Sequence, residues 1–355
     1  IKMILKKIIK VKKLFLDQYI NYCLYKFDTS YYQSKNIFGY KGDFVTSPHI
    51  SSIFSEMLAF WTFSYWDKIK KPKDLNILEL GPGDGTMAKD IITTLKKIKQ
   101  FNGKINYFFL EKSKYLKKKQ KEKLIHLNNI YWIKNIKDFQ KNNLVILSNE
   151  FFDALPVKQF IKKKNKWLEK GVQFNRKTNK LQFFFEPASQ VHIKKISRYF
   201  DLEKNNFIEI CYEAKKIVKD LSLLLQKENS IFLTIDYGDF STFSNDTLQA
   251  IKNRKKVDPL TFPGESDLTT QVNFYYLIKL FNEYNLHKIF FINQSQFLQK
   301  LGINERLASQ SKLLNSKKLF NLKQSIKRLI HPKEMGNLFK VLVIGNKKQK
   351  FDLGK

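Results

Sequence analysis

Two patterns of hydrophobic and polar positions alternate along the central part of the chain. Short apolar runs are each followed by a stretch in which apolar residues recur every three or four positions. Apolar runs of this length are typical of buried strands, and the second pattern is typical of amphipathic helices. Strands that alternate with helices predict a parallel sheet covered on both faces by helices.

The pattern predicts an α/β fold with a seven-stranded, mostly parallel sheet that ends in an antiparallel hairpin. Strands are expected at residues 76–80, 104–110, 129–133, 144–147, 231–235, 288–293 and 338–344. Helices are expected at 86–99, 113–124, 212–226 and 273–284, with further helices up to about residue 329. Between residues 157 and 186 the pattern changes to two or three strands with polar turns near 163–165 and 176–179, which predicts an antiparallel insertion.

The composition is that of a folded chain with a sizeable core, since 43% of the 355 residues are hydrophobic and 15% are aromatic. This length suits one enlarged domain or two domains. Lysine and arginine total 65 against 32 acidic residues, a net charge of +33. Only five of the 65 are arginines, the side chain best suited to bidentate phosphate recognition. The charge therefore favours a lysine-coated surface over a nucleic-acid site.

The two cysteines, Cys23 and Cys211, form neither a disulfide framework nor a C-x-x-C metal pair. This usage fits a reducing compartment. No apolar run reaches the roughly 18 residues of a membrane span. Residues 1–20 are basic and partly apolar, which favours an ordinary amphipathic helix over a transit peptide, since transit peptides are rich in arginine and serine. There are two alternatives. The segment could be a membrane-surface helix, or it could be the end of a fragment, since the chain does not begin with Met.

A glycine-rich segment, Glu79-Leu80-Gly81-Pro82-Gly83-Asp84-Gly85-Thr86, connects the first predicted strand of the sheet to a helix. Glycines at such a turn let backbone amides and the helix N-terminus approach a ligand closely. The spacing is not the G-x-G-x-x-G of dinucleotide folds, and no Gly-Lys-Ser/Thr ending marks a P-loop. The carboxylate of Glu79 would repel a pyrophosphate but suits a ligand that carries an ammonium and a sulfonium.

Glu111 stands at the end of the next predicted strand. An acid at this place can accept hydrogen bonds from both ribose hydroxyls of an adenosine. The alternative for the glycine segment is a tight turn without a ligand. The alternative for Glu111 is a surface or helix-capping role. In combination the residues favour S-adenosyl-L-methionine as cofactor, with five binding candidates: Glu79, Gly81, Gly83, Gly85 and Glu111.

The segment Ser148–Pro156, after the fourth predicted strand, has two acids that flank two phenylalanines. In this architecture the methyl acceptor would bind here. Methyl transfer is an in-line displacement, and a nearby carboxylate can align the nucleophile or keep it unprotonated. Carboxylates can also hold a guanidinium acceptor bidentately. Glu150 and Asp153 are therefore catalytic candidates. In the alternative interpretation Asp153 caps a helix and the phenylalanines belong to the core.

These motifs, with others along the chain, resemble the MidA-like methyltransferase family, whose mitochondrial members are complex I assembly factors. The resemblance covers roughly residues 20–345 in family order. The matching segments are Gly42–Pro48, Glu79–Thr86, Asn149–Pro156, Ile235–Gly238, Asp246–Ala250, Pro263-Gly264 with Asp267–Thr269, and Met335–Lys340.

The resemblance implies a class I methyltransferase with a Rossmann-like fold and a protein arginine methyltransferase activity, as in mitochondrial members that act on a complex I subunit. It also implies that residues 42–47 fold over the cofactor, which adds Asp43 and Thr46 to the cofactor-binding candidates. The loops of Asn149-Glu150 and of Asp236 would line the acceptor pocket. We assign Asn149 to the cofactor side and Asp236 to the catalytic side.

One residue departs from the family pattern, which has Glu after Thr-Ser-Pro where this chain has His49. If that acid helps to hold the acceptor, its absence weakens the arginine assignment. Three hypotheses follow: an arginine methyltransferase that acts on a protein partner and is linked to complex I assembly, an RNA or small-molecule methyltransferase, and a non-catalytic assembly chaperone that binds the cofactor. Lysine rather than arginine richness favours a bacterial cytoplasm over a mitochondrial matrix.

The predicted domain organisation has three parts. An N-terminal helical cap with the cofactor-covering loop is followed by the methyltransferase core, which includes a helical insertion at about 239–285. Inserted antiparallel strands and a helix lie on the substrate side. The cap spans residues 1–70, the core spans 71–156 and 228–345, and the insertion on the substrate side spans 157–227.

Overall fold

The computed structural model describes residues 2–34, 46–241, 243–346 and 351. The chain forms two compact units. We call the one that contains the large sheet the sheet unit and the other the insertion unit. The sheet unit comprises Phe38–Phe151, Lys219–Gly238 and Phe281–Lys355, and the insertion unit comprises Ile1–Ile37, Phe152–Val218 and Asp239–Leu280. No helix in the described part combines the length and the apolar content that a membrane crossing requires.

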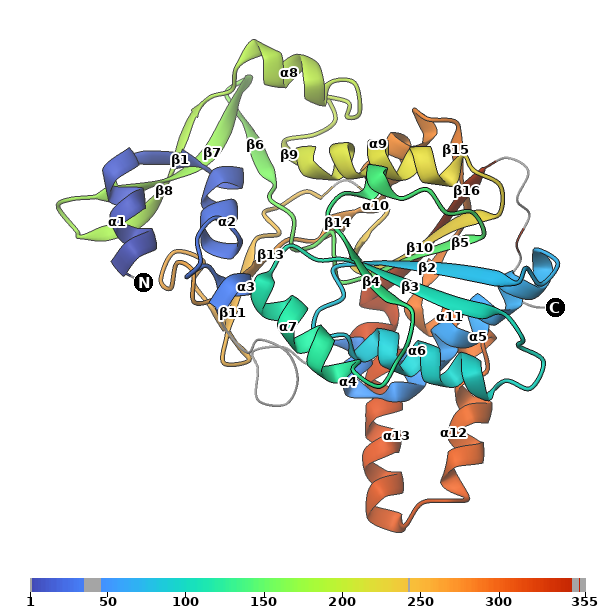
Figure 1. Ribbon diagram of the computed structural model, residues 1–355. Coiled ribbons are helices and arrows are strands. Elements are labelled where there is room, and N and C mark those ends of the chain that lie inside the picture. Colours follow the sequence, from blue (N-terminus) through green and yellow to red (C-terminus); the bar gives the residue numbers. More distant parts are fainter. Residues whose placement is uncertain (1, 35–45, 242, 347–350, 352–355) are drawn as a thin grey trace. The chain divides into compact units, whose positions relative to one another are not determined.

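The sheet unit is built on seven strands in the order β15-β16-β10-β5-β2-β3-β4 (Figure 1). The strands from β10 to β4 run parallel, and β16 pairs antiparallel with both β10 and β15. This confirms the predicted sheet and its closing hairpin. The bounds are β2 (Asp74–Leu80), β3 (Lys104–Leu110), β4 (Ile130–Ile133), β5 (Leu144–Asn149), β10 (Ser230–Asp239), β15 (Leu286–Asn293) and β16 (Phe339–Asn346).

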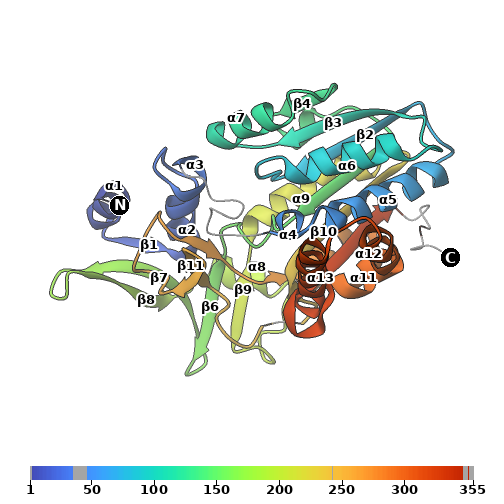
Figure 2. The same ribbon diagram turned by 90° about the horizontal axis from the view of Figure 1, so that it is seen from below.

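Helices α5 and α6 lie side by side on one face of this sheet (Figures 1 and 2). The helices of the unit are α4 (Ser47–Ile50), α5 (Ser52–Lys68), α6 (Thr86–Lys97), α7 (Lys114–Lys123), α11 (Gln294–Lys300), α12 (Ile303–Ser311) and α13 (Ser316–Ile330). We expected residues 52–68 to belong to an N-terminal cap, but α5 packs into the core of the sheet unit. The reason is that α5 buries large side chains, among them Phe54, Trp61 and Trp66, which need the sheet as a partner.

The insertion unit contains an antiparallel sheet in the order β1-β7-β6-β9, with β8 paired to β7. The bounds are β1 (Lys13–Phe15), β6 (Lys158–Lys163), β7 (Lys166–Asn175), β8 (Lys180–Pro187) and β9 (Phe207–Ile210). Lys164 and Asn165, between β6 and β7, both have positive φ (46° and 60°), as a two-residue hairpin turn requires. The predicted antiparallel insertion is confirmed.

The helices around this sheet are α1 (Lys2–Val11), α2 (Leu16–Leu24), α3 (Tyr31–Ser34) and α8 (Gln190–Ile196). We expected one amphipathic helix over residues 1–20, but two helices form there with β1 between them. The break follows Val11, where Lys12 adopts φ 64°, a conformation that an α-helix cannot continue through. Helices α9 (Tyr212–Leu225) and α10 (Phe274–Asn282) begin in this unit.

The segment 239–285, expected to be a helical insertion, contains a second small sheet before α10. Its order is β12-β11-β13, with bounds β11 (Gln249–Lys252), β12 (Lys255–Val257) and β13 (Asp267–Thr269); β14 (Val272–Asn273) follows. Asn253 and Arg254 both have positive φ (50° and 62°) and form a tight hairpin turn. Because Arg254 is not a usual residue for such a turn, the pattern did not reveal it.

Candidate active site

The glycine loop after β2 has the geometry that brings a backbone close to a ligand. Gly81, Gly83 and Gly85 have φ of 63°, 56° and 83°, in the left-handed region that glycine adopts at no steric cost. Gly85 immediately precedes α6, so the amides at the start of that helix face the loop. A Cβ on Gly81 would lie 2.8 Å from a ring carbon of Phe151. A larger residue at this position would therefore require the ring of Phe151 to move.

Asp84 fixes the shape of the loop. Its Oδ1 accepts hydrogen bonds from the backbone N–H of Thr86 (3.1 Å) and from the Thr86 hydroxyl (2.7 Å). Its Oδ2 pairs with Lys123 of α7 at 2.5 Å and with His49 at 3.1 Å. Burial alone would raise the pKa of this carboxyl, but the hydrogen bonds from His49, Lys123 and Thr86 outweigh it and hold the pKa below its usual range.

His49 connects this loop to the turn that begins α4. Its Nε2 donates to Asp84, and its Nδ1 lies 2.8 Å from the hydroxyl of Thr46. A neutral imidazole can donate at one nitrogen and accept at the other, so both contacts form at once. Thr46, a predicted cofactor-binding residue, thus lies beside the glycine loop. Asp43 is outside the described residues.

Glu79 and Glu111 are the two acids at the ends of β2 and β3. Glu79 is only 2% exposed, and the hydroxyl of Tyr107 donates to it at 2.8 Å. Burial raises the pKa of Glu79 to about 8 and that of Glu111 to about 7. Asp84 and Glu111 raise the pKa of Glu79 further by charge repulsion. A cationic ligand would stabilise the ionised form of both carboxyls.

Gln120 of α7, which the sequence did not single out, ties these parts together. Its side-chain amide donates to the carbonyl of Gly83 (2.7 Å) and to Glu111 (3.2 Å). Its oxygen accepts from the indole of Trp132 at 2.8 Å. Gln120 is fully buried in a helix that is otherwise rich in lysine. A polar residue one turn after Leu116 on the buried face was the signal that could have revealed it.

Glu150 lies in the loop after β5, in an unusual backbone conformation with φ 52°. One carboxylate oxygen accepts from the backbone N–H of Ser47 (3.2 Å) and from the side-chain amide of Asn149 (3.0 Å). Burial raises the pKa of Glu150. Two buried oxygens of these neighbours, Asn149 Oδ1 and Ser47 Oγ, have no hydrogen-bond partner within the described residues. Buried oxygens of this kind fit a site that a ligand completes.

Asp236, at the end of β10, is fully buried. Its two carboxylate oxygens accept from the backbone N–H groups of Phe151 (3.1 Å) and Tyr237 (3.0 Å). These bonds hold the Glu150-Phe151 loop in place. Asp153 is in the insertion unit, where its carbonyl accepts from the backbone N–H of Thr270 at 3.0 Å. The catalytic roles of Glu150, Asp153 and Asp236 stay predictions.

Comparisons with known proteins agree with this architecture. Residues 57–292 match the family model described as "Putative S-adenosyl-L-methionine-dependent methyltransferase". "Protein arginine methyltransferase NDUFAF7, mitochondrial" from Danio rerio is 31% identical over 98% of this chain and 86% of that protein. Its homolog from Drosophila melanogaster is 28% identical over 95% of this chain and 83% of that protein. The crystal structure of a COG1565 superfamily member from Burkholderia thailandensis bound to S-adenosyl-homocysteine has a TM-score of 0.84 at 22% identity, and covers 99% of this chain and 92% of that one.

The sheet topology and the glycine loop define an S-adenosyl-L-methionine-dependent methyltransferase of class I. The chain belongs to the NDUFAF7 family, the MidA-like methyltransferases to which its motifs were matched. The family confirms the predicted cofactor. Relatives with mitochondrial names and a bacterial structure are both among the matches.

Proposed function

We propose that the protein transfers a methyl group from S-adenosyl-L-methionine to an arginine side chain of a protein substrate. The names of the relatives, protein arginine methyltransferases, support this substrate class. The observation that carries the proposal is the position of Glu150, a buried acid held by Ser47 and Asn149 next to two buried oxygens that lack partners. A link to the assembly of respiratory complex I, which the resemblance implies, belongs to the same proposal.

The residues of the chain divide the work between binding and alignment. When bound, the cofactor supplies the methyl group. Glu79 and the glycine loop offer a carboxylate and backbone amides, and Glu111 offers oxygens that can accept from ribose hydroxyls. Asn149 Oδ1 is an acceptor for an ammonium group. These side chains hold and orient the donor of the methyl group.

Glu150 is the residue that acts on the acceptor. Its Oε1 takes both protein donors, whereas its Oε2 accepts no hydrogen bond within the described part of the chain. An N–H of the acceptor guanidinium can donate to Oε2, which aligns the nitrogen and favours loss of its proton. Asp236 fixes the backbone of Phe151, the next residue, and so keeps Glu150 in position.

One labelling experiment tests the proposal. The protein is incubated with S-adenosyl-L-methionine carrying a labelled methyl group and with a lysate from a host that lacks its gene. We expect label in a protein band and, after acid hydrolysis, in methylated arginine. Label in RNA or in a small molecule would contradict the proposal. Tight cofactor binding without transfer to any fraction would show a non-catalytic binding protein instead.

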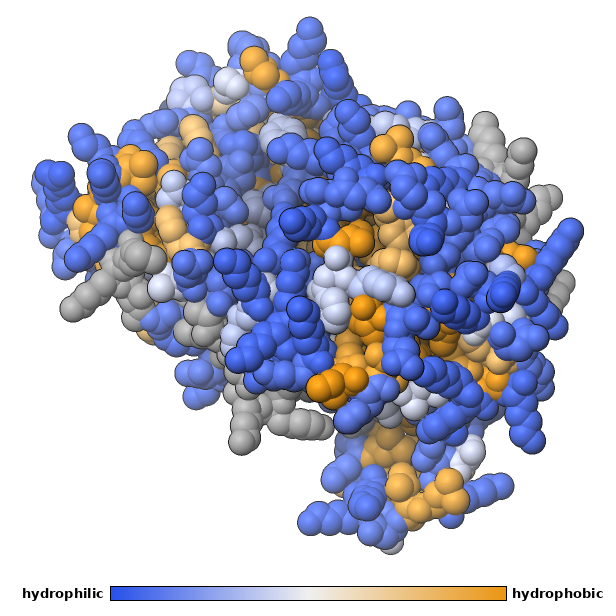
Figure 3. Space-filling model, in the orientation of Figure 1, coloured by the Kyte–Doolittle hydropathy of each residue, from blue (hydrophilic) through white to orange (hydrophobic). Residues whose placement is uncertain are grey.

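The cellular compartment is a second part of the proposal. The scarcity of arginine relative to lysine leads us to propose the bacterial cytoplasm, with the mitochondrial matrix as the alternative. Hydrophilic residues cover most of the face shown in Figure 3. This agrees with a lysine-coated surface and does not require a nucleic-acid partner.

A further inference from the structure

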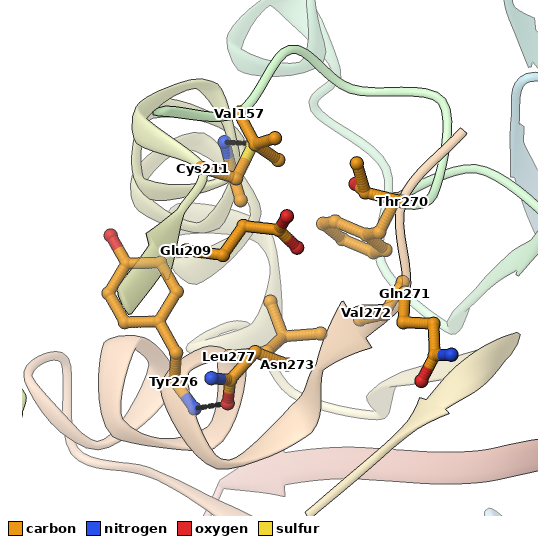
Figure 4. A pocket seen from close by; sticks show the side chains of 11 residues that line it. Val157, Glu209, Cys211, Thr270, Gln271, Val272, Asn273, Tyr276 and Leu277 are labelled. Carbon is orange, nitrogen blue, oxygen red and sulfur yellow. Dashed lines mark hydrogen bonds between the residues drawn. The ribbon is translucent and has the colours of Figure 1, made fainter. Parts of the chain in front are cut away.

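A small pocket lies within the insertion unit (Figure 4). Its walls come from the loop before β6, from β9, from the start of α9 and from residues 270–277. The cavity volume is about 30 Å³, roughly twice what a single water molecule needs. A flat group of a few heavy atoms therefore fits better than a bulky ligand.

The carboxylate of Glu209 points into this pocket (Figure 4). Glu209 is on the last residues of β9, is 5% exposed, and is the one acid among the lining residues. Apolar side chains such as Val157, Val272 and Leu277 form much of the remaining wall. Apolar walls with a few directed polar groups are typical of ligand sites.

The hydrogen bonds of Glu209 hold its carboxylate in place without exhausting it. Gln159 donates to Oε2 at 2.7 Å, and the hydroxyl of Thr247 lies 2.8 Å and 3.0 Å from the two oxygens. An ionised carboxylate has about four acceptor positions. Two donors occupy two of them, so two positions stay available to a group that enters the pocket.

The charge of Glu209 interacts with that of Lys170, which lowers the pKa of Glu209, but the two side chains form no direct ion pair. Lys170, the nearest buried lysine of this network, donates to the oxygen of Gln159 at 3.0 Å and forms its ion pair with Asp246. Across the described residues, Glu209 makes no ion pair. Burial raises the pKa of Glu209 to about 7. A cation that entered the pocket would favour the ionised form and gain a desolvated partner.

We propose that this pocket binds the guanidinium group of a second arginine side chain on the protein substrate, distinct from the acceptor arginine that Glu150 aligns, with Glu209 as its carboxylate partner. A guanidinium is planar, weakly hydrated and has parallel N–H donors that match the two available acceptor positions. Phe152, which also lines the pocket, adds an aromatic side chain of the kind that guanidinium groups stack on. An ammonium, which is compact and strongly hydrated, fits less well. The inference rests on the proposed function and names a residue that recognises the protein substrate in addition to the contact of Glu150 with the acceptor.

A titration with small cations tests the pocket directly. The full chain is titrated with ¹³C-methylguanidinium, and the methyl signal is followed by NMR. We expect Glu209→Gln to weaken binding by about tenfold or more, the effect of removing one charged bidentate partner. Methylammonium should bind the unchanged protein about tenfold more weakly. Glu265→Gln is the matched control: it makes the same change at an acid of the same unit that pairs with Lys252 and does not line the pocket.

The folding of Glu209→Gln is checked by thermal unfolding and by titration with S-adenosyl-homocysteine. If that variant does not fold, the pH dependence of the unchanged protein takes its place. Affinity for methylguanidinium should fall about tenfold per pH unit below about 7 and level off above about 8, because only the ionised carboxylate pairs with the cation. The charged and titratable neighbours are Asp246, Lys170, Tyr276 and Cys211, and burial raises the pKa of Cys211 to about 12, outside this range.

Two results would overturn the inference: a Glu209→Gln protein that binds methylguanidinium as tightly as the unchanged protein, or binding of methylammonium with equal affinity. Failure of the proposed function gives a different result. If label enters arginine while methylguanidinium does not bind, the pocket assignment is wrong and the function stands. If methylguanidinium binds through Glu209 but no protein takes up label, the proposed function is wrong and the pocket stands.

Discussion

His49 donates a hydrogen bond from Nε2 to Asp84, 3.1 Å away in the glycine loop. Through its other nitrogen, 2.8 Å from the hydroxyl of Thr46, it ties the turn before α4 to the glycine loop. The resemblance to the family implies glutamate at this position. A glutamate would place a second negative charge beside Asp84, whereas histidine supplies a donor. The departure therefore has a structural role in this chain that the sequence pattern did not suggest.

We predict that His49→Ala weakens binding of S-adenosyl-homocysteine about three- to tenfold, because one or two hydrogen bonds that position the loop are lost. Isothermal titration measures the affinity. His126→Ala is the control, since His126 is exposed in the same unit. Equal affinity of the His49→Ala protein and the unchanged protein would show that the contacts of His49 do not position the glycine loop for ligand binding.

Two glycine substitutions should differ in severity. Alanine at Gly81 or Gly85 must adopt positive φ (63° and 83°), which costs about 1–2 kcal/mol. At Gly81 the new methyl group would also lie 2.8 Å from Phe151, whereas at Gly85 the nearest atom is at 3.4 Å. We therefore expect Gly81→Ala to lower the free energy of unfolding, measured with urea, by more than Gly85→Ala does. The same or a smaller loss at Gly81 would refute the close approach of Phe151.

Cofactor binding should release protons. The pKa of Glu79 is about 8 and that of Glu111 about 7, both raised by burial, so each carboxyl is at least partly protonated at neutral pH. A cationic ligand favours their ionised forms. Affinity for S-adenosyl-L-methionine should then rise with pH between about 6 and 8. Titration calorimetry in two buffers of different ionisation enthalpy measures the proton release, and Glu79→Gln should reduce it.

The stability of the ligand-free protein depends on pH in the opposite direction from the cofactor affinity. The folded state holds the proton of Glu79 more tightly than the unfolded chain does, where the carboxyl has its ordinary pKa of 4.5. This contribution to stability is complete at low pH and is lost as pH rises towards about 8. A ligand-free protein and a cofactor-bound protein should therefore show different pH trends of their melting temperatures between pH 6 and 8.

The sheet and the tight turn of the glycine loop could be predicted because local sequence determines them. Leu75, Ile77, Leu78 and Leu80 are buried apolar residues of β2, as expected for a central strand buried on both faces. Gly81, Gly83 and Gly85 are at positions with positive φ, where glycine is the residue of choice. Runs and glycine turns of this kind can be read without knowledge of distant contacts.

Contacts between distant segments could not be predicted in the same way. Gln120 belongs to the site because folding brings it to Gly83, 37 residues earlier in the chain. Glu209 lines a pocket because β9 pairs with β6 and because Thr247 lies nearby. The apolar run Phe207–Ile210 with one acid was visible in the sequence, but nothing local shows that this acid faces a cavity.

The last prediction concerns Glu150. Glu150→Gln should abolish methyl transfer, a loss of about a hundredfold or more for a group that aligns and deprotonates the acceptor, yet leave affinity for S-adenosyl-homocysteine within about twofold. The reason is that the amide oxygen of glutamine can still accept from Ser47 and Asn149, so the loop keeps its bonds while the charge is lost. Transfer is measured with labelled S-adenosyl-L-methionine, and Glu122→Gln, at an acid paired with Lys119 on α7, is the control. A fully active Glu150→Gln protein would remove Glu150 from the mechanism, and a loss of cofactor binding would make it a structural residue of the loop.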